Sequence, residues 1–217
     1  MRQKLGLGYV LATCLGLVIQ VSTANAGVIT HTSRADFDAA TGATIVEDFN
    51  SFTTEVDFRT VPLDVGDFTI STTNPSLVRN FIEIPPFQFT QLGVDGTNII
   101  NALVSSGVSL SLTFDAPITA FGADFGQIND GFIRTEILAG GETFVPPVGG
   151  SNEARFFGFT SDTAFTTVEF VGLENDGFGI DNVTFAPAVS GVVPEPTSIA
   201  IFGALALVTT SSRRRRK

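Results

Sequence analysis

The seven residues 108–114, Val-Ser-Leu-Ser-Leu-Thr-Phe, alternate strictly between apolar and hydroxyl-bearing side chains. Side chains in a β-strand point to opposite faces in turn, so this spacing puts every apolar residue on one face and every hydroxyl on the other. The segment therefore predicts a β-strand with one face on a core and one face towards water. It favours an antiparallel sheet, in which such half-buried strands are common.

Seven further segments on either side have the same character. They are short, rich in Phe, Val, Ile and Thr, and separated by Gly, Pro, Asn or Asp, as expected of strands joined by turns. The prolines fall between the segments or at their starts, where they do not interrupt a ladder of hydrogen bonds. This pattern predicts an all-β antiparallel sandwich. The segments are residues 44–49, 67–70, 118–125, 132–138, 155–159, 165–171 and 178–185.

One short helix is expected near the start of this region, over residues 33–40. Ser33 has the side chain of an N-cap, and Asp36 stands three residues later, as in a capping box. Gly42 follows where a helix would end.

The amino-terminal residues have the composition of a secretory signal peptide. Arg2 and Lys4 are cationic, residues 5–21 are mostly apolar, and Ala24 and Ala26 form an A-x-A cleavage site. We therefore expect the secretion machinery to export the chain and signal peptidase to cut before Gly27, which makes residues 1–26 a removable leader.

Composition changes once this leader is set aside. The single Cys, Met and Tyr all lie within it, so residues 27–191 contain no Cys and must fold without disulfides. The same region has 21 acidic and five basic residues, hence a net charge of −16. So negative a domain is expected neither to bind nucleic acid nor to lie on an anionic membrane surface.

The carboxy-terminal region carries three signals in a fixed order. Val193, Pro194, Glu195 and Pro196 come first, and the two prolines there impose an extended backbone. An apolar run over about residues 199–208 follows, predicting a short membrane-embedded helix. Last comes a cationic cluster that resists translocation, made of Arg213, Arg214, Arg215, Arg216 and Lys217.

This order resembles the PEP-CTERM sorting signal of bacterial surface proteins, carried here by Pro194, Glu195, Pro196, the apolar run and the arginines. The resemblance implies that an exosortase reads and processes residues 192–217 in a Gram-negative bacterium whose surface is rich in exopolysaccharide. It also implies transient insertion in the inner membrane, followed by release to the cell surface or the extracellular matrix. The apolar run is shorter than the ~20 residues of a full span, which suits transient residence better than permanent anchoring. An ordinary tail anchor is the alternative.

Residues 27–191 offer little conventional catalytic chemistry. They contain no Cys, Lys or Tyr, and His31 is their only histidine. A pair of carboxylates can still hydrolyse glycosides, but the aromatic platforms that usually hold sugars are reduced to Phe, because Trp and Tyr are missing. We therefore expect no enzyme here, with a carboxylate-pair glycoside hydrolase as an alternative.

Acidic residues near both ends of the region are candidate metal ligands. Glu47 shares a strand face with Ile45 and Phe49, and Asp181 shares one with Val183 and Phe185, so each carboxylate is expected to point towards an apolar face. A buried carboxylate needs a partner, and Ca²⁺ is a suitable one. The predicted ligands are Glu47, Asp48, Asp181 and Asn182. The apolar phase of the last segment also switches at Asp181 and Asn182, which predicts a β-bulge.

A second resemblance concerns residues 46–49, 120–125 and 179–185. They are similar to strands of secreted jelly-roll domains of the MAM-like and carbohydrate-binding-like kinds. This resemblance implies a jelly-roll topology and a structural Ca²⁺ held by the acidic residues of the first and last strands. The alternative is that Glu47 and Asp181 are ordinary strand-end carboxylates bonded to water, backbone amides or an arginine.

Together these features predict three parts: a signal peptide (1–26), a β-sandwich domain (27–191) and a sorting signal (192–217). The predicted function is that of an exported structural protein of the cell envelope or extracellular matrix. A calcium-dependent glycan-binding module, with exopolysaccharide as partner, is the first alternative.

Overall fold

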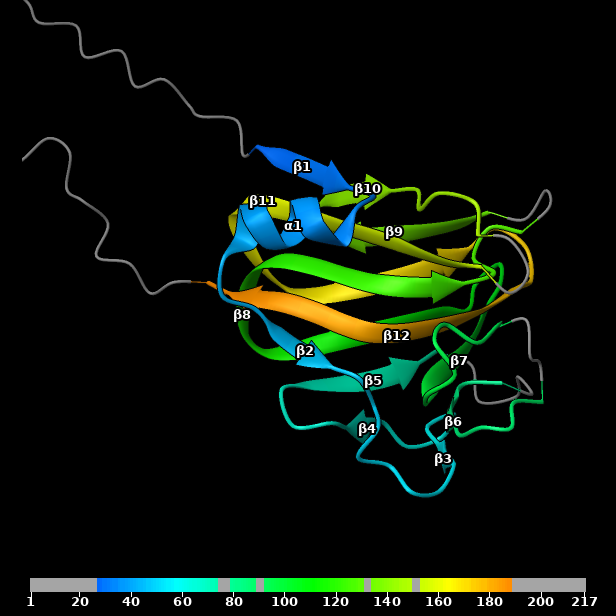
Figure 1. The fold of residues 1–217 in the computed structure, drawn as a ribbon. Helices are drawn as coiled ribbons and strands as arrows, with labels where there is room; N and C mark the ends of the chain where they lie inside the picture. The colour runs from blue at the N-terminus through cyan, green and yellow to red at the C-terminus, as the bar shows by residue number, and fades with distance from the viewer. Residues whose placement is uncertain (1–26, 74–78, 89–91, 131–133, 150–152, 189–217) are drawn as a thin grey trace, which may run out of the picture.

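The computed structural model describes residues 27–73, 79–88, 92–130, 134–149 and 153–188. They are almost entirely β-structure with one short helix (Figure 1). The elements are β1 (Val28–His31), α1 (Arg34–Thr41), β2 (Ile45–Glu47), β3 (Val56–Asp57), β4 (Leu63–Asp64), β5 (Phe68–Thr72), β6 (Phe81–Glu83), β7 (Ile99–Val104), β8 (Ser109–Gly126), β9 (Thr135–Ala139), β10 (Glu142–Phe144), β11 (Ala154–Gly172) and β12 (Asp176–Pro187).

Two long bent strands, β8 and β11, connect the layers of the structure. The first part of β8 pairs with β5 and with the last part of β11, whereas its second part pairs with β12 and with the first part of β11. All the pairings between named strands are antiparallel. Strands that pass from one layer to the other at a bend give a sandwich-like arrangement from a single continuous sheet. The all-β antiparallel prediction is confirmed at this level.

Both bends fall at residues that lie between two predicted strand segments. In β8 the exposed residues Asp115, Ala116 and Pro117 divide the two predicted segments. In β11 the pairing with β8 shifts register after Thr160 and again after Phe165. The sequence thus predicted two pairs of strands where the structure has two continuous, bent ones.

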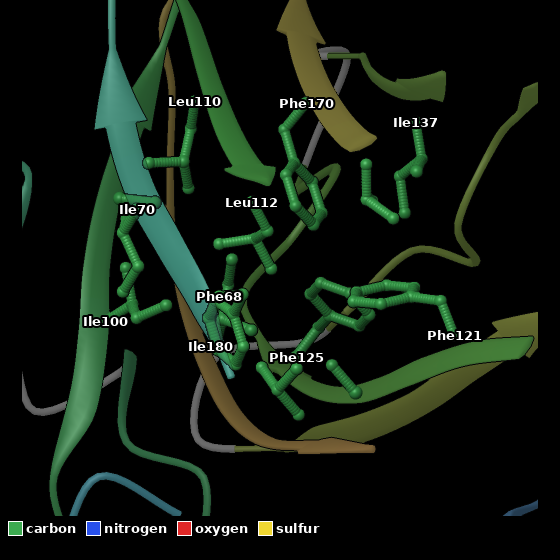
Figure 2. Close-up of a cluster of buried hydrophobic side chains, with 14 of the residues drawn as sticks. Phe68, Ile70, Ile100, Leu110, Leu112, Phe121, Phe125, Ile137, Phe170 and Ile180 are labelled. Carbon is green, nitrogen blue, oxygen red and sulfur yellow. The ribbon is translucent and has the colours of Figure 1, made fainter. Parts of the chain in front are cut away.

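Phenylalanine and aliphatic side chains together fill the space between the layers (Figure 2). Phe121 and Phe125 from β8 meet Phe170 of β11 at ring-centroid distances of 6.3 and 6.0 Å, in the tilted or edge-to-face geometry that aromatic pairs prefer. Phe68 and Leu112 lie in the same cluster, and both are fully buried. The alternating face of residues 108–114 is therefore a core face, as expected.

The helix α1 has the capping residues that the sequence predicts, and its helical residues start and end one position later than the expected range 33–40. Ser33 is the N-cap and accepts a hydrogen bond from the amide of Asp36, and Gly42 closes the other end with φ at 73°. Phe37 fixes the helix to the outside of the sheet by packing on Phe156 at 5.4 Å.

Two strand glycines allow a close approach of the chain. Gly126 of β8 and Gly179 of β12 are paired, and the Leu92 carbonyl lies over both. A Cβ at either position would come within 2.2 Å of that oxygen. The segment containing Leu92 is thereby held against the outer face of the sheet.

Two sequence expectations are corrected here. The last predicted segment was expected to start at residue 178, but Asp176 already begins β12, is only 1% exposed and accepts hydrogen bonds from the Asn129 amide and the Thr135 hydroxyl. Six strands that lack a clear alternating pattern were also not predicted: β1, β3, β4, β6, β7 and β10.

Candidate functional site

The centre of the candidate site is a bulge in β12. The register between β12 and β8 shifts between Asp181 and Thr184, and Asn182 has a positive φ of 50°. The break in apolar phase at this point predicted a bulge, and the structure confirms it. Its effect is that Asp181, Val183 and Phe185 are all buried, with Asp181 fully so.

Asp181 is held by oxygen- and nitrogen-bearing groups on two segments. The Asn182 amide donates to its Oδ1 at 2.6 Å, and the Thr97 hydroxyl lies 3.2 Å from its Oδ2. The same Thr97 hydroxyl also bonds to Asp95 Oδ1, which places a second carboxyl group beside Asp181. Two negative charges held this close repel each other, which favours a proton on one of them in the absence of a cation.

The two acids of this pair have pKa values that move apart. Burial raises the pKa of Asp181 to about 7, with the negative charges of Asp95 and Asp124 adding to the rise. Burial also acts to raise the pKa of Asp95, but hydrogen bonds from Thr97, Asn182 and Asp181 outweigh it and lower that pKa. Asp181 is therefore the member that keeps the proton.

Asp124, the next acidic group, is neutralised by Arg34 from the first turn of α1. The Arg34 guanidinium lies 2.7 Å from Asp124 Oδ2 and donates to the Thr184 hydroxyl at 2.8 Å. It also lies over the ring of Phe156, 4.7 Å from its centroid. Nothing in the sequence connects these residues, because they come from four distant segments, α1, β8, β11 and β12.

Glu47 and Asp48, the other two predicted ligand carboxylates, make local contacts. Glu47 stands opposite Val183 in the β2–β12 pair, and its Oε1 accepts the Phe49 amide at 2.7 Å. Asp48 accepts the Asn50 amide at 3.0 Å. Burial raises the pKa of Glu47, the Phe49 amide lowers it, and the charges of Asp48 and Asp67 raise it further.

The described residues contain no group of three or more His, Cys, Asp and Glu side chains placed to hold a metal ion. The donors gathered at the bulge are nevertheless all oxygens or amides, namely Asp95, Asp181, Thr97 and Asn182, which is the kind of donor that Ca²⁺ takes. The chemical type of these donor groups therefore fits a hard cation. Asp95 and Thr97 were missed in the sequence because their segment has no periodicity that places it beside β12.

The remaining predicted site residues lie outside the described part of the chain. These are the cleavage-site residues Ala24 and Ala26, the motif Val193, Pro194, Glu195 and Pro196, and the tail Arg213, Arg214, Arg215 and Arg216. Gly27 is described, and its amide donates to Asp162 Oδ2 at 3.0 Å. Among the described residues no helix has the length and apolarity needed to span a membrane.

No protein-family model matches the sequence, and a comparison with curated proteins found no similar one. The functional argument therefore rests on the residues themselves.

Proposed function

We propose that this chain is an exported protein of the bacterial cell envelope or extracellular matrix, sorted through its C-terminal signal. The observation that carries the proposal is the ordered series of Pro194-Glu195-Pro196, an apolar run and Arg213–Arg216, combined with a signal peptide at the other end. Each part has a physical role: an extended recognition motif, a segment that enters the membrane, and a cationic stop.

The composition of the described domain permits export without disulfide formation. Its core is a single large cluster of Phe, Ile, Leu and Val side chains, and residues 27–191 lack Cys. Such a domain folds in the same way in reducing and oxidising compartments. In this proposal it acts by binding or structure rather than catalysis, has a jelly-roll topology, and has an exosortase as its processing partner.

The proposal is tested by following the full chain in a Gram-negative host that carries an exosortase. We expect mass spectrometry to find the protein outside the inner membrane, beginning at Gly27 and shortened at its C-terminus near Pro194. The triple substitution P194A/E195A/P196A should leave the full C-terminus in the membrane fraction. A Ser190→Ala variant, changed just before the motif, is the matched control and should be processed normally.

Two results would contradict the proposal. One is equal processing of the triple variant and the wild type. The other is unchanged processing in a host from which the exosortase has been removed, because cleavage would then be the work of another protease. Retention of the intact tail in the membrane in every case would favour an ordinary tail anchor.

A further inference from the structure

A polar pocket of about 310 Å³ lies beside the β3–β6 pair, away from the acidic bulge of β12. Its lining consists of Glu55, Asp57, Arg59, Phe81 and Gln88. Figure 1 shows β3 and β6 together at one end of the molecule, at the bottom of the view. The volume is at the lower end of the range for small-molecule sites, about 300–1,000 Å³.

The strand register explains why these side chains meet. Asp57 of β3 stands opposite Phe81 of β6, and the next pair, Val56 and Ile82, faces the other way. Ile82 is fully buried and Val56 packs against the core, so the alternate positions are turned outward. Phe81 is only partly buried on this outward face.

The walls of the pocket are fixed by contacts beneath and beside it. The Asp57 carboxylate accepts both the backbone amide of Arg59, at 2.8 Å, and the Arg59 Nε, at 3.0 Å, which locks the two side chains together. On the other side the fully buried Glu83 accepts the Gln88 amide at 2.5 Å. The Asn101 side chain holds Glu83 in turn, at 2.8 Å.

Phe81 differs from the core phenylalanines in its surroundings. In the described part of the chain it makes none of the ring–ring contacts that join Phe68, Phe121 and Phe170 to their neighbours. An accessible aromatic ring beside carboxylates, a guanidinium and an amide can stack on the C–H face of a sugar while the polar groups bind its hydroxyls. Sites that combine an apolar surface with a few fixed polar groups orient their ligands in this way.

We propose that this pocket binds one pyranose unit of a neutral polysaccharide, with Phe81 as the stacking surface and Glu55, Asp57, Arg59 and Gln88 as hydroxyl partners. The charge of the surroundings selects against anionic sugars: Glu55 and Asp57 outnumber Arg59, and the domain as a whole carries −16. The inference deepens the proposed function, since it rests on it for the extracellular supply of polysaccharide. It involves none of the residues at the bulge.

The test is native electrophoresis of the full-length protein, purified in mild detergent, through gels containing dextran, galactomannan or alginate. We expect at least one of the two neutral polymers to retard the wild type, in calcium and in chelator alike. Phe81→Ala should weaken binding about tenfold through the loss of the stacking surface. Glu55→Gln should weaken it about tenfold through the loss of a charge-assisted hydrogen bond.

Glu142→Gln is the matched control, because it removes one exposed carboxylate on β10 and should bind as the wild type does. Loss of binding in the Phe81 variant could result from misfolding, because Phe81 is partly buried. The Glu55 variant tests the pocket without this complication, since Glu55 is exposed. The assignment is overturned by no retardation in dextran or galactomannan, by stronger retardation in alginate, by retardation lost in chelator, or by Glu55→Gln binding normally. Because sorting is measured by processing in cells, failure here would leave the sorting proposal standing.

Discussion

At the scale of single residues, Asp181 stands in an environment very unlike water. It is fully buried and adjoins a second carboxyl group, Asp95, while the nearby cation Arg34 is engaged by Asp124. The consequence is a carboxyl group that folding holds in its protonated form to about pH 7.

This arrangement makes stability depend on pH in a definite direction. With a chelator present, the folded state keeps the Asp181 proton between about pH 4 and pH 7, whereas the unfolded state releases it near 3.8. The stabilisation is therefore complete below about pH 4 and is lost as pH rises towards 7, by roughly 2–4 kcal/mol in all. Asp181→Asn should consequently melt higher than the wild type at pH 8 and at a similar temperature at pH 4.5, measured by circular dichroism.

Asp38→Asn, on an exposed position of α1, controls for the change in net charge. If Asp181→Asn lowers the melting temperature equally at both pH values, the buried carboxyl group is not protonated at neutral pH.

The bulge could be predicted from the residues on either side of it, but the residues that contact Asp181 could not. Side chains on one face of a regular strand are two residues apart, but Ile180 and Val183 are three apart. One extra residue between them is needed for Phe178, Ile180, Val183 and Phe185 all to face the core. The local pattern is therefore sufficient to predict the bulge. Asp95 and Thr97 reach Asp181 only through the tertiary fold, across 84 residues in the case of Thr97. The β3–β6 pocket was missed for the same reason.

At the scale of elements, α1 is attached to the sheet by Arg34 as well as by Phe37. Arg34 joins β8 through Asp124 and β12 through the Thr184 hydroxyl and the Asn182 carbonyl. Its ion pair is partly buried, with side-chain exposures of 32% and 19%, so water screens it less than a surface pair.

A double-mutant cycle measures this attachment. Arg34→Ala should cost about 1–3 kcal/mol of unfolding free energy, because it leaves Asp124 unpaired in a partly buried position. Combining it with Asp124→Ala should show a coupling of about 1 kcal/mol or more. The measurement is thermal unfolding of the four full-length proteins.

The chain contains its own reference for that experiment. Arg155 and Glu153 form an exposed pair at 2.7 Å, and their coupling should be about 0.5 kcal/mol or less. Equal couplings for the two pairs would mean that Arg34 is a surface group and that Phe37 alone holds the helix.

Element prediction succeeded where the local pattern was strong. The capped helix and the segments around Phe114, Phe125, Phe170 and Phe185 were all recognised, because alternation and turn residues mark them. Bends were read as strand ends, since residues 115–117 and 161–163 look like turns in sequence and only the pairing with other strands shows that the ladder continues. Two-residue strands such as β3 and β4 have no period to detect.

At the scale of the whole molecule, the predicted Ca²⁺ site is tested through the effect of Ca²⁺ on the stability of the fold. A cation that binds only the folded state must raise the melting temperature as its concentration exceeds its dissociation constant. We expect millimolar Ca²⁺ to stabilise the full-length protein relative to chelator, more at pH 8 than at pH 5, because Asp181 must lose its proton to bind a metal. Asp181→Asn should abolish the shift.

The Glu47→Gln variant distinguishes the ligand set predicted from the sequence, which includes Glu47, from a set confined to the bulge. Loss of the shift in this variant too would support the predicted site that includes Glu47, whereas retention would confine the ligands to the bulge. The absence of any shift at pH 8 would make Glu47 and Asp181 ordinary carboxylates and would remove calcium from the account.

The position of β12 has a consequence for the timing of export. This last strand lies inside the sheet, paired with β8, β7 and β2, and it ends at Pro187, only a few residues before Val193. Under the proposed export, a chain that crosses the inner membrane from its amino end would deliver the strand that completes its fold almost last, together with the motif that the sorting enzyme would read. Until then β8 and β7 would lack a shared neighbour, so the exported protein of this proposal would remain incomplete and open to periplasmic chaperones and proteases. Completion of the fold and presentation of the motif would thus coincide, and the sorting enzyme would receive substrates that have just become able to fold.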